Sequence, residues 1–445
     1  MRDVILVAAF AFSALLAIRT PFVGILIFFV ISFMNPHRFT WGFAYSLPFA
    51  AAAAAVTFVS LYMHLNEIKL PKVRETFLFL LLWLFFTLTT YFAMDPEAAW
   101  QTWEINNKIF LMTFIAMLLI NTKKRLQYFV FAIIVSIGFI GIKGALFGLS
   151  TGGQYRVWGP PESFMEDNNG IGLAMLMVAV LCYFLKELFK GKWQYFAILI
   201  TGAALAVSTL LTYSRGALFG MAVVGFFVFL KSKYKVVVFL NFIVVAIIAV
   251  NVLPAQWLER MNSINSYDED KSALMRINSW VMSYNLAKVH PLGGGFGCWS
   301  LELYDKYSPD PELGRQLSGG ATTAHSIYFE VLATQGFGGL AIYLLCAGSI
   351  LLSLLKLELG FRRIPGAEWI AIYSRGFTMS IIAFLASGAF LSRAFFDLFW
   401  AIFACALCFK AIVYSGNWIE EPLPEKVHSQ AEKSLIANNT ILLQK

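Results

Sequence analysis

Residues 77–86 read Phe-Leu-Phe-Leu-Leu-Leu-Trp-Leu-Phe-Phe, and residues 242–250 read Phe-Ile-Val-Val-Ala-Ile-Ile-Ala-Val. Unbroken apolar runs are typical of helices that cross a bilayer, whereas the strands of a membrane β-barrel alternate apolar and polar side chains. The chain of 445 residues is 59% hydrophobic and only 13% charged, while an ordinary soluble domain is about a quarter charged. The sequence therefore predicts an all-α, polytopic integral membrane protein.

Similar apolar runs recur along the chain and predict about twelve or thirteen transmembrane helices. The expected spans are residues 4–18, 21–35, 46–63, 76–93, 109–121, 127–148, 169–185, 194–212, 215–230, 236–252, 325–355, 376–392 and 395–414. The first, second and fifth are short, so one of them could be a re-entrant or surface helix. The first run lacks a convincing small-residue cleavage site, so we expect a retained helix and not a signal peptide.

The loops between the expected spans fall into two sets by charge. One set has clusters of Lys and Arg, and the alternate loops have a single basic residue each: Arg38, Lys108, Arg156, Arg215 and Arg393. Because positively charged loops stay in the cytoplasm, the second set is expected to face outward. The net charge of +8 comes from the first set, so it indicates membrane topology and not nucleic-acid binding.

One polar stretch, residues 253–324, interrupts the apolar pattern on the outward side. It predicts four regions: transmembrane helices in 1–252, a structured periplasmic loop in 253–324, transmembrane helices in 325–415 and a flexible cytoplasmic tail in 416–445.

Helical spacing of apolar residues within the loop predicts a helix over Lys271–Val289, which His290 and Pro291 end. The run Gly293–Gly297 has no strand before it and no Lys-Ser/Thr after it. We therefore expect a tight turn against the membrane face, not a phosphate loop. Residues 308–320 are rich in Pro, Gly and Ser and are expected to form a loop.

Two arginines are candidates for binding an anion. Arg215 stands where a short break separates two apolar runs, and an arginine inside the bilayer costs about 2.5 kcal/mol or more without a partner. A ligand phosphate would be a good partner because guanidinium binds it in a bidentate fork; a snorkelling interfacial arginine is the alternative. Arg276 lies on the predicted loop helix, where spacing alone favours an ordinary surface arginine.

His325 begins the first apolar run after the loop and is a candidate general base. The dipole at a helix N-terminus disfavours protonation of an imidazole there, which suits a group that takes a proton from a hydroxyl. A capping or interfacial histidine is the alternative.

Polar residues at two further outward positions are ambiguous. Asp167-Asn168-Asn169 is either an N-cap cluster or polar lining of a site. Arg393 is either a substrate ligand or the partner of Asp397.

Neither a metal site nor a disulfide is expected. The histidines are scattered over positions 37, 64, 290, 325 and 428, and no carboxylate pair has ligand spacing. Cys298 is in the loop, while the other four cysteines lie in apolar spans and cannot pair with it.

Three stretches, in this order, resemble the O-antigen ligase and polymerase superfamily of bacterial polysaccharide enzymes. They are Thr212–Leu218, Arg276–Trp280 leading to His290–Gly297, and Ala324–Leu332 followed by Gly336–Gly339. Together they extend over about residues 167–398. Met34–Tyr45 and residues 158–169 resemble the branch called O-glycosylation ligases, which is associated with exosortase and exopolysaccharide systems.

The resemblance implies a glycosyltransferase of the bacterial inner membrane with its active site at the periplasmic face. Such an enzyme moves a glycan from undecaprenyl pyrophosphate to an acceptor hydroxyl, without a metal or cofactor and with inversion. By motif, Arg215 and Arg276 would engage the donor pyrophosphate and His325 would activate the acceptor. Arg393, Asp167 and Arg156 are expected to be further substrate contacts.

The acceptor stays open among a lipid A-core sugar, a growing polysaccharide and a protein Ser or Thr. A polysaccharide polymerase of the same superfamily, a lipid-linked glycan flippase and a membrane scaffold are the alternatives. Flippases usually place charges near the bilayer midplane and have repeat symmetry. The sequence has its candidate charges at the outer ends of spans and no visible repeat, which favours the enzyme.

Overall fold

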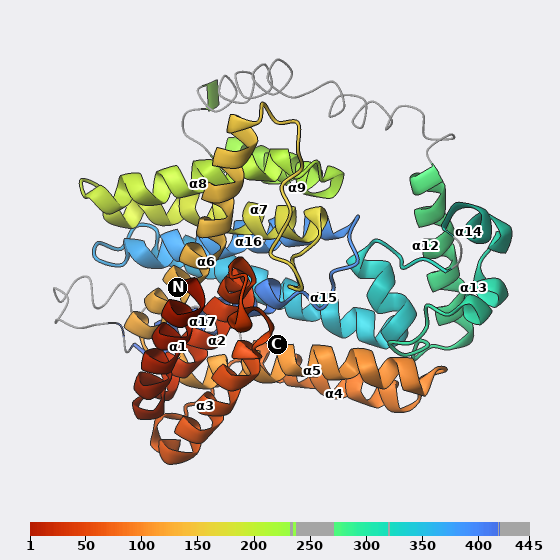
Figure 1. Cartoon of the computed structure of the whole chain (residues 1–445), viewed down its shortest axis with the longest axis horizontal. Helices are drawn as coiled ribbons and strands as arrows, with labels where there is room; N and C mark the ends of the chain where they lie inside the picture. Colours follow the sequence, from red (N-terminus) through yellow and green to blue (C-terminus); the bar gives the residue numbers. More distant parts are fainter. Residues whose placement is uncertain (232–234, 237–270, 319–320, 417, 419–445) are drawn as a thin grey trace.

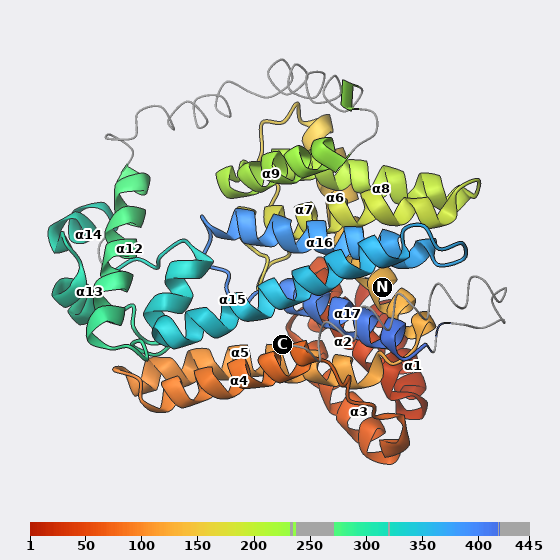
Figure 2. The same cartoon turned by 180° about the vertical axis from the view of Figure 1, so that it is seen from behind.

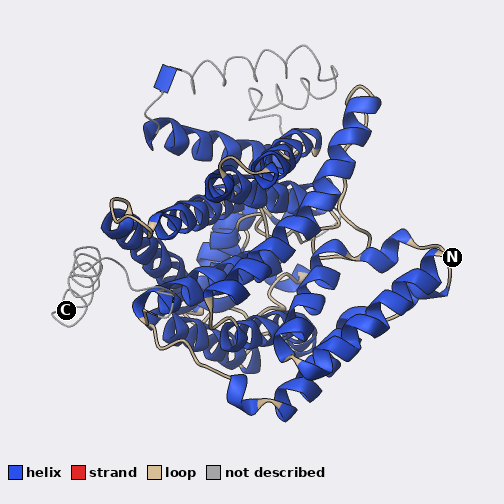
Figure 3. Cartoon of the chain, turned by 90° about the vertical axis from the view of Figure 1, so that its left-hand side faces the viewer, coloured by secondary structure: helices blue, strands red, loops and turns tan. Residues whose placement is uncertain are grey.

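The computed structural model describes residues 1–231, 235–236, 271–318, 321–416 and 418, and this part of the chain contains helices and no strands (Figure 3). The α-helices are α1 (Arg2–Arg19), α2 (Pro21–Met34), α3 (Phe49–Met63), α4 (Arg74–Tyr91), α5 (Pro96–Leu119), α6 (Lys123–Ser150), α7 (Asn168–Leu185), α8 (Trp193–Leu211), α9 (Arg215–Lys231), α12 (Lys271–Val289), α13 (Leu301–Tyr307), α14 (Pro311–Ser318), α15 (Ile327–Phe361), α16 (Glu368–Gly388) and α17 (Asp397–Tyr414). Short 3-10 helices cover Pro36–Phe39, Phe43–Ser46, Leu65–Glu67 and Lys186–Phe189.

Six helices of the described chain are long and apolar enough to cross a membrane: α6, α7 with its 3-10 extension, α8, α15, α16 and α17. The helices α2 and α3 are apolar but shorter. The expected all-α, polytopic membrane fold is therefore confirmed. The count of twelve or thirteen spans stays a prediction, and residues 237–252 of the expected span 236–252 lie outside the described residues.

The helix α5 begins earlier than the expected span 109–121. Its N-cap is Asp95, whose Oδ1 accepts a hydrogen bond from the Ala98 N–H at 3.2 Å. Pro96 occupies the first helical position, where a missing N–H is not a loss. Trp100 and Trp103, which precede the expected span, thus lie on the first turns of α5. Because the first half of this helix is polar, the apolar pattern predicted only its second half.

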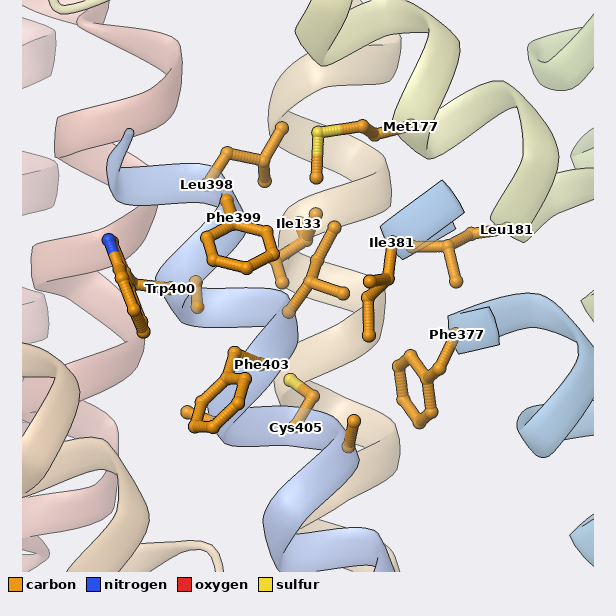
Figure 4. Close-up of a cluster of buried hydrophobic side chains, with 14 of the residues drawn as sticks. Ile133, Met177, Leu181, Phe377, Ile381, Leu398, Phe399, Trp400, Phe403 and Cys405 are labelled. Atoms are coloured by element: carbon orange, nitrogen blue, oxygen red, sulfur yellow. The ribbon is translucent and has the colours of Figure 1, made fainter. Parts of the chain in front are cut away.

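The apolar core lies where α17 passes between α6, α7 and α16 (Figure 4). The labelled buried side chains in this view are Ile133, Met177, Leu181, Phe377, Ile381, Leu398, Phe399, Trp400, Phe403 and Cys405. The rings of Phe384 and Phe399 stack with their centroids 3.9 Å apart. Because lipid tails are as apolar as these side chains, close van der Waals packing stabilises the arrangement.

Glycines on α6 let α8 approach closely. A Cβ atom on Gly141 would lie 2.4 Å from Leu205 Cδ2, and one on Gly148 would lie 2.3 Å from Leu211 Cδ1. Small residues four or more apart on one face are a common way for membrane helices to pack. This contact also fixes the end of α6 beside the α8–α9 turn, where the Val157 N–H donates to the Leu211 carbonyl at 3.0 Å.

The two sets of loops that differ in charge gather at opposite ends of the helices. At one end Arg125 pairs with Glu67, and Lys231 pairs with Glu358 at 2.8 Å. At the other end Arg38 pairs with Glu162 at 2.5 Å. This spatial grouping agrees with the grouping by charge. The compartment that each end faces stays a prediction.

The helices α12, α13 and α14 form a small unit beside the N-terminal part of α15 (Figures 1 and 2). The predicted helix Lys271–Val289 is confirmed as α12. Asn278 on α12 ties the unit together, because its Nδ2 donates to Tyr304 Oη at 3.0 Å and to the Asp310 carbonyl at 2.7 Å.

The expected loop 308–320 contains the helix α14. Asp310 Oδ1 accepts the Leu313 N–H at 3.0 Å, and Pro311 is the first helical residue. These are helix-start signals that the Pro- and Ser-rich composition masked. Residues 253–270 of the predicted loop region and 419–445 of the predicted tail lie outside the described residues.

The glycine run after α12 forms a tight turn, as expected, and it packs against α15; its place at the membrane face stays a prediction. The Gly294 N–H donates to the Ala333 carbonyl at 2.8 Å, and the Gly295 N–H donates to the Thr334 carbonyl at 3.0 Å. Gly336 has φ +65° and kinks α15 at this point. A Cβ on Gly293, itself at φ +77°, would lie 2.5 Å from the Gly336 nitrogen. The turn therefore fixes the α12–α14 unit to the kink.

Candidate active site

His325 lies in the segment that leads into α15, whose N-cap is Ser326. The backbone of His325 is left-handed, with φ +46°, and its N–H donates to Ser392 Oγ at 2.8 Å. Positive φ is uncommon outside glycine, and such strained residues cluster at functional sites. The hydrogen bond joins His325 to the turn between α16 and α17.

The imidazole of His325 favours the neutral state. Protein packed around the ring lowers its pKa below the ordinary value of 6.5, and the positive charge of Arg276 lowers it further. The residue nevertheless remains exposed to solvent. The sequence predicted a neutral histidine on the ground of the helix dipole; the structure gives the same direction from burial and from a neighbouring arginine.

The helix α12 contacts residues that precede and follow His325 in the chain. Trp280 Nε1 donates to the Ala324 carbonyl at 2.7 Å, and its ring stacks on Phe329 with centroids 5.1 Å apart. Ser279 Oγ lies 2.9 Å from Thr322 Oγ1. Because residues four apart share a helix face, Trp280 brings Arg276 toward the same segment. Spacing alone favoured a surface residue, but the fold places Arg276 within electrostatic reach of His325.

Arg393 and Asp167 form an ion pair that joins the α16–α17 turn to the start of α7. Asp167 Oδ1 also accepts the N–H groups of Asn169 and Gly170, both at 2.9 Å. Asp167 is thus both the N-cap and a contact of a candidate site residue. Asp397, the alternative partner, also acts on Arg393 through its charge, so the ion pair with Asp167 adds to that pairing. Arg393 follows Ser392, so this ion pair lies beside the backbone contact of His325.

Arg215 is the first residue of α9 and is half-buried. The start of α9 packs on the end of α16, where a Cβ on Gly216 would lie 3.3 Å from the Ser387 carbonyl oxygen. One turn further, the rings of Phe219 and Phe390 are 5.2 Å apart. The α16–α17 turn therefore brings the start of α9 to the region that holds His325 and Arg393. We call the region of Arg215, Arg276, His325 and the Arg393–Asp167 pair the His325 corner.

Arg156 lies elsewhere. Its guanidinium is 5.7 Å from the ring centroid of Tyr213, and it lines a cavity of about 600 Å³ together with Arg38 and Lys143. Tyr213 precedes Arg215 by two residues, so this cavity adjoins the α8–α9 turn. It does not include the residues of the His325 corner.

Sequence reasoning missed two residues that shape this corner. Glu330 Oε2 accepts the Ala394 N–H at 3.0 Å, so it holds the turn on which Arg393 lies. A lone carboxylate among apolar residues near the start of a membrane helix is a signal that could have found it. Ser392 gives no such signal, because its role depends on contact with a segment far away in sequence.

The arrangement can bind an anion and accept a proton. The Arg276 guanidinium acts on a neutral, solvent-accessible imidazole. A guanidinium and a neutral imidazole are the groups needed to neutralise a leaving phosphate and to deprotonate a hydroxyl. Within the described ranges, no group of three or more His, Cys, Asp or Glu side chains could hold a metal ion. The expectation of a metal-independent reaction stays a prediction.

The helices and this corner define a multi-pass membrane protein with a polar site at one end of its helices. Residues 197–344 match the family model described as O-Antigen ligase, and residues 1–187 match a family of unknown function, DUF5935. The match to residues 197–344 supports the O-antigen ligase superfamily, a class of membrane glycosyl-transferring ligases and polymerases. Arg215, Arg276 and His325 lie in the O-antigen ligase segment.

No curated protein matches the chain. The stretches that resemble the exosortase-associated branch lie within the segment matched by the family of unknown function. That branch assignment stays a prediction.

Proposed function

We propose that the protein transfers a glycan from undecaprenyl pyrophosphate to an acceptor hydroxyl at the periplasmic face of the bacterial inner membrane. The observation that supports this most is the neutral, exposed imidazole of His325 beside the Arg276 guanidinium. Arg215 and Arg393 add positive charge at the same end of the helices. A pyrophosphate is already a good leaving group, so the remaining tasks are to neutralise its charge and to position the acceptor.

In the proposed reaction the acceptor oxygen attacks the anomeric carbon of the donor sugar. The bond from that carbon to the pyrophosphate oxygen breaks, and its electron pair stays on the pyrophosphate. The acceptor proton passes to a ring nitrogen of His325. A single displacement of this kind inverts the anomeric centre.

The arginines have separate tasks in this proposal. Arg215 and Arg276 bind oxygens of the leaving pyrophosphate, since guanidinium matches phosphate geometry in a bidentate fork. Arg393, which lies against Asp167, would contact the sugar or the distal phosphate. The polyprenyl tail would lie in the bilayer.

A polymerase of the same superfamily would use the same site with a second lipid-linked glycan as acceptor. A flippase is less well supported, because the candidate charges gather at one end of the helices and not near their middle. The identity of the acceptor therefore distinguishes a ligase from a polymerase. Cleavage of the bond between the sugar and the pyrophosphate distinguishes both enzymes from a transporter.

The test is transfer in vitro by the purified full chain, with a defined undecaprenyl-pyrophosphate oligosaccharide, candidate acceptors and EDTA. We expect release of undecaprenyl pyrophosphate together with a glycosylated acceptor. Arg215→Ala and Arg276→Ala should abolish or sharply reduce transfer, and Arg→Lys should rescue only partly because ammonium lacks the fork.

Arg315→Ala is the matched control. Arg315 lies on α14 in the same loop unit, exposed and paired with Asp305 and Glu312, each at 2.5 Å. Its loss should leave transfer unchanged. A normal rate in Arg215→Ala would exclude the assigned role of that residue.

A further inference from the structure

The cavity that Arg156 lines has basic and aromatic walls and lies beside the end of α6. Its volume is about 600 Å³, within the range of roughly 300–1,000 Å³ for small-molecule pockets. Its lining includes Arg38, Lys143, Arg156, Phe39, Tyr155 and Trp158. We call it the basic-aromatic cavity.

Positive charge exceeds negative charge in this cavity. Arg38 pairs with Glu162 at 2.5 Å, yet its buried Nε has no hydrogen-bond partner among the described residues. Lys143 and Arg156 form no ion pair with any carboxylate of the described chain. Instead Lys143 Nζ lies 4.4 Å from the ring centroid of Phe39, and Arg156 faces Tyr213. A cation held over a ring keeps N–H donors available, so the cavity is suited to an anion.

The position of Lys143 indicates an anion that belongs to a lipid. Lys143 is on α6, about two turns before the helix ends at Ser150, and α6 is one of the helices able to span the membrane. Its neighbours on α6 include Phe139, Ile142 and Leu146, which are 43%, 37% and 66% exposed. A ligand with its charged group in the cavity would have this apolar helix surface beside it for its tails. A soluble anion would not use that surface.

We propose that the basic-aromatic cavity binds the phosphate head group of a membrane lipid, as a site separate from the His325 corner. The cavity is not isolated from that corner, because the Tyr213 hydroxyl donates to the Gly153 carbonyl and its ring lies against Arg156. A lipid head group bound there would therefore lie next to the turn that leads into Arg215. This binding does not depend on the proposed glycosyl transfer.

The test measures binding of dioctanoyl phosphatidic acid to the purified full chain in detergent, by native mass spectrometry. We expect Lys143→Ala/Arg156→Ala to weaken binding at least tenfold. The matched control is Lys124→Ala/Lys190→Ala, which removes the same charge from exposed lysines outside the cavity and should bind as the wild type does. Glu162→Gln should strengthen binding several-fold, since it removes the carboxylate that pairs with Arg38.

Two competitors distinguish the sources of the ligand. Dioctanoylglycerol, which has the same tails and no phosphate, should not displace phosphatidic acid; displacement would overturn the role of the phosphate. Inorganic phosphate should displace it only at far higher concentration; displacement at an equal concentration would overturn the assignment to a lipid. Equal weakening by the two double variants would overturn the site itself.

Discussion

Two groups of charged residues lie at opposite ends of this apolar protein, and they differ in how far their charges are exposed to solvent. At one end, Lys410 of α17 is 2% exposed and lies 2.7 Å from Glu75 Oε2 of α4. Ser349 and Ser353 donate to Glu75 Oε1 at 2.6 and 2.8 Å. This group is closed: its charges are satisfied by one another within the protein.

The His325 corner at the other end is open. His325 is exposed, and Arg393 and Asp167 each keep about a third of their side-chain surface accessible, at 34% and 37%. The comparison teaches that charge in an apolar protein has two uses. A matched, buried group fixes how helices pack, whereas a charged group that stays accessible to solvent can bind a ligand.

The largest effect on the rate of transfer is expected when the His325 corner loses its proposed general base. A general base typically contributes about a hundredfold to ten-thousandfold to rate and little to donor affinity. His325→Ala should therefore transfer the glycan far more slowly while binding the lipid-linked donor nearly as the wild type does. Transfer kinetics and donor binding on the same preparation provide the measurement. Loss of binding in proportion to rate would make His325 a ligand contact, and Asp167 would be the next candidate base.

Breaking the closed group should damage stability and not chemistry. Lys410→Met leaves the Glu75 carboxylate buried without its partner, and such a loss costs about 3–5 kcal/mol. We expect a lower midpoint of thermal unfolding in detergent, with transfer per folded molecule close to that of the wild type. Lys410→Met/Glu75→Gln should recover much of the loss because no charge stays buried. A slower reaction at an unchanged midpoint would show that this end takes part in function.

The smallest effect expected is a shift in the pH at which the His325 imidazole becomes protonated. Its pKa is lowered by burial and by Arg276, so the neutral base persists to a pH below 6.5 and is lost as pH falls through that lowered pKa. Arg276→Gln removes a positive charge that opposes protonation, so the pKa should rise and the base should be lost at a higher pH. Carbethoxylation of the peptide that contains His325, followed against pH by mass spectrometry, measures this without needing activity. An unchanged profile would mean that Arg276 does not act on the imidazole.

The sequence by itself determined the membrane helices. A backbone inside hydrocarbon must satisfy its own hydrogen bonds, so an apolar run long enough to cross the membrane is expected to be helical. Helical spacing and Pro291 gave the bounds of α12. The same reasoning failed for α5 and α14, where capping residues, and not apolar runs, set the helix start. Motifs also nominated Arg215, Arg276 and His325, which lie in the matched O-antigen ligase segment.

Only the tertiary structure decided which of these residues meet. The pairing of Arg393 with Asp167, the approach of Arg276 to His325 and the cavity formed by Arg38, Lys143 and Arg156 all join segments far apart in the chain. Local patterns record which face of a helix is apolar, but they do not record which helix ends lie side by side. That choice depends on the packing of α6, α7, α16 and α17 around one another, where small residues allow close approach.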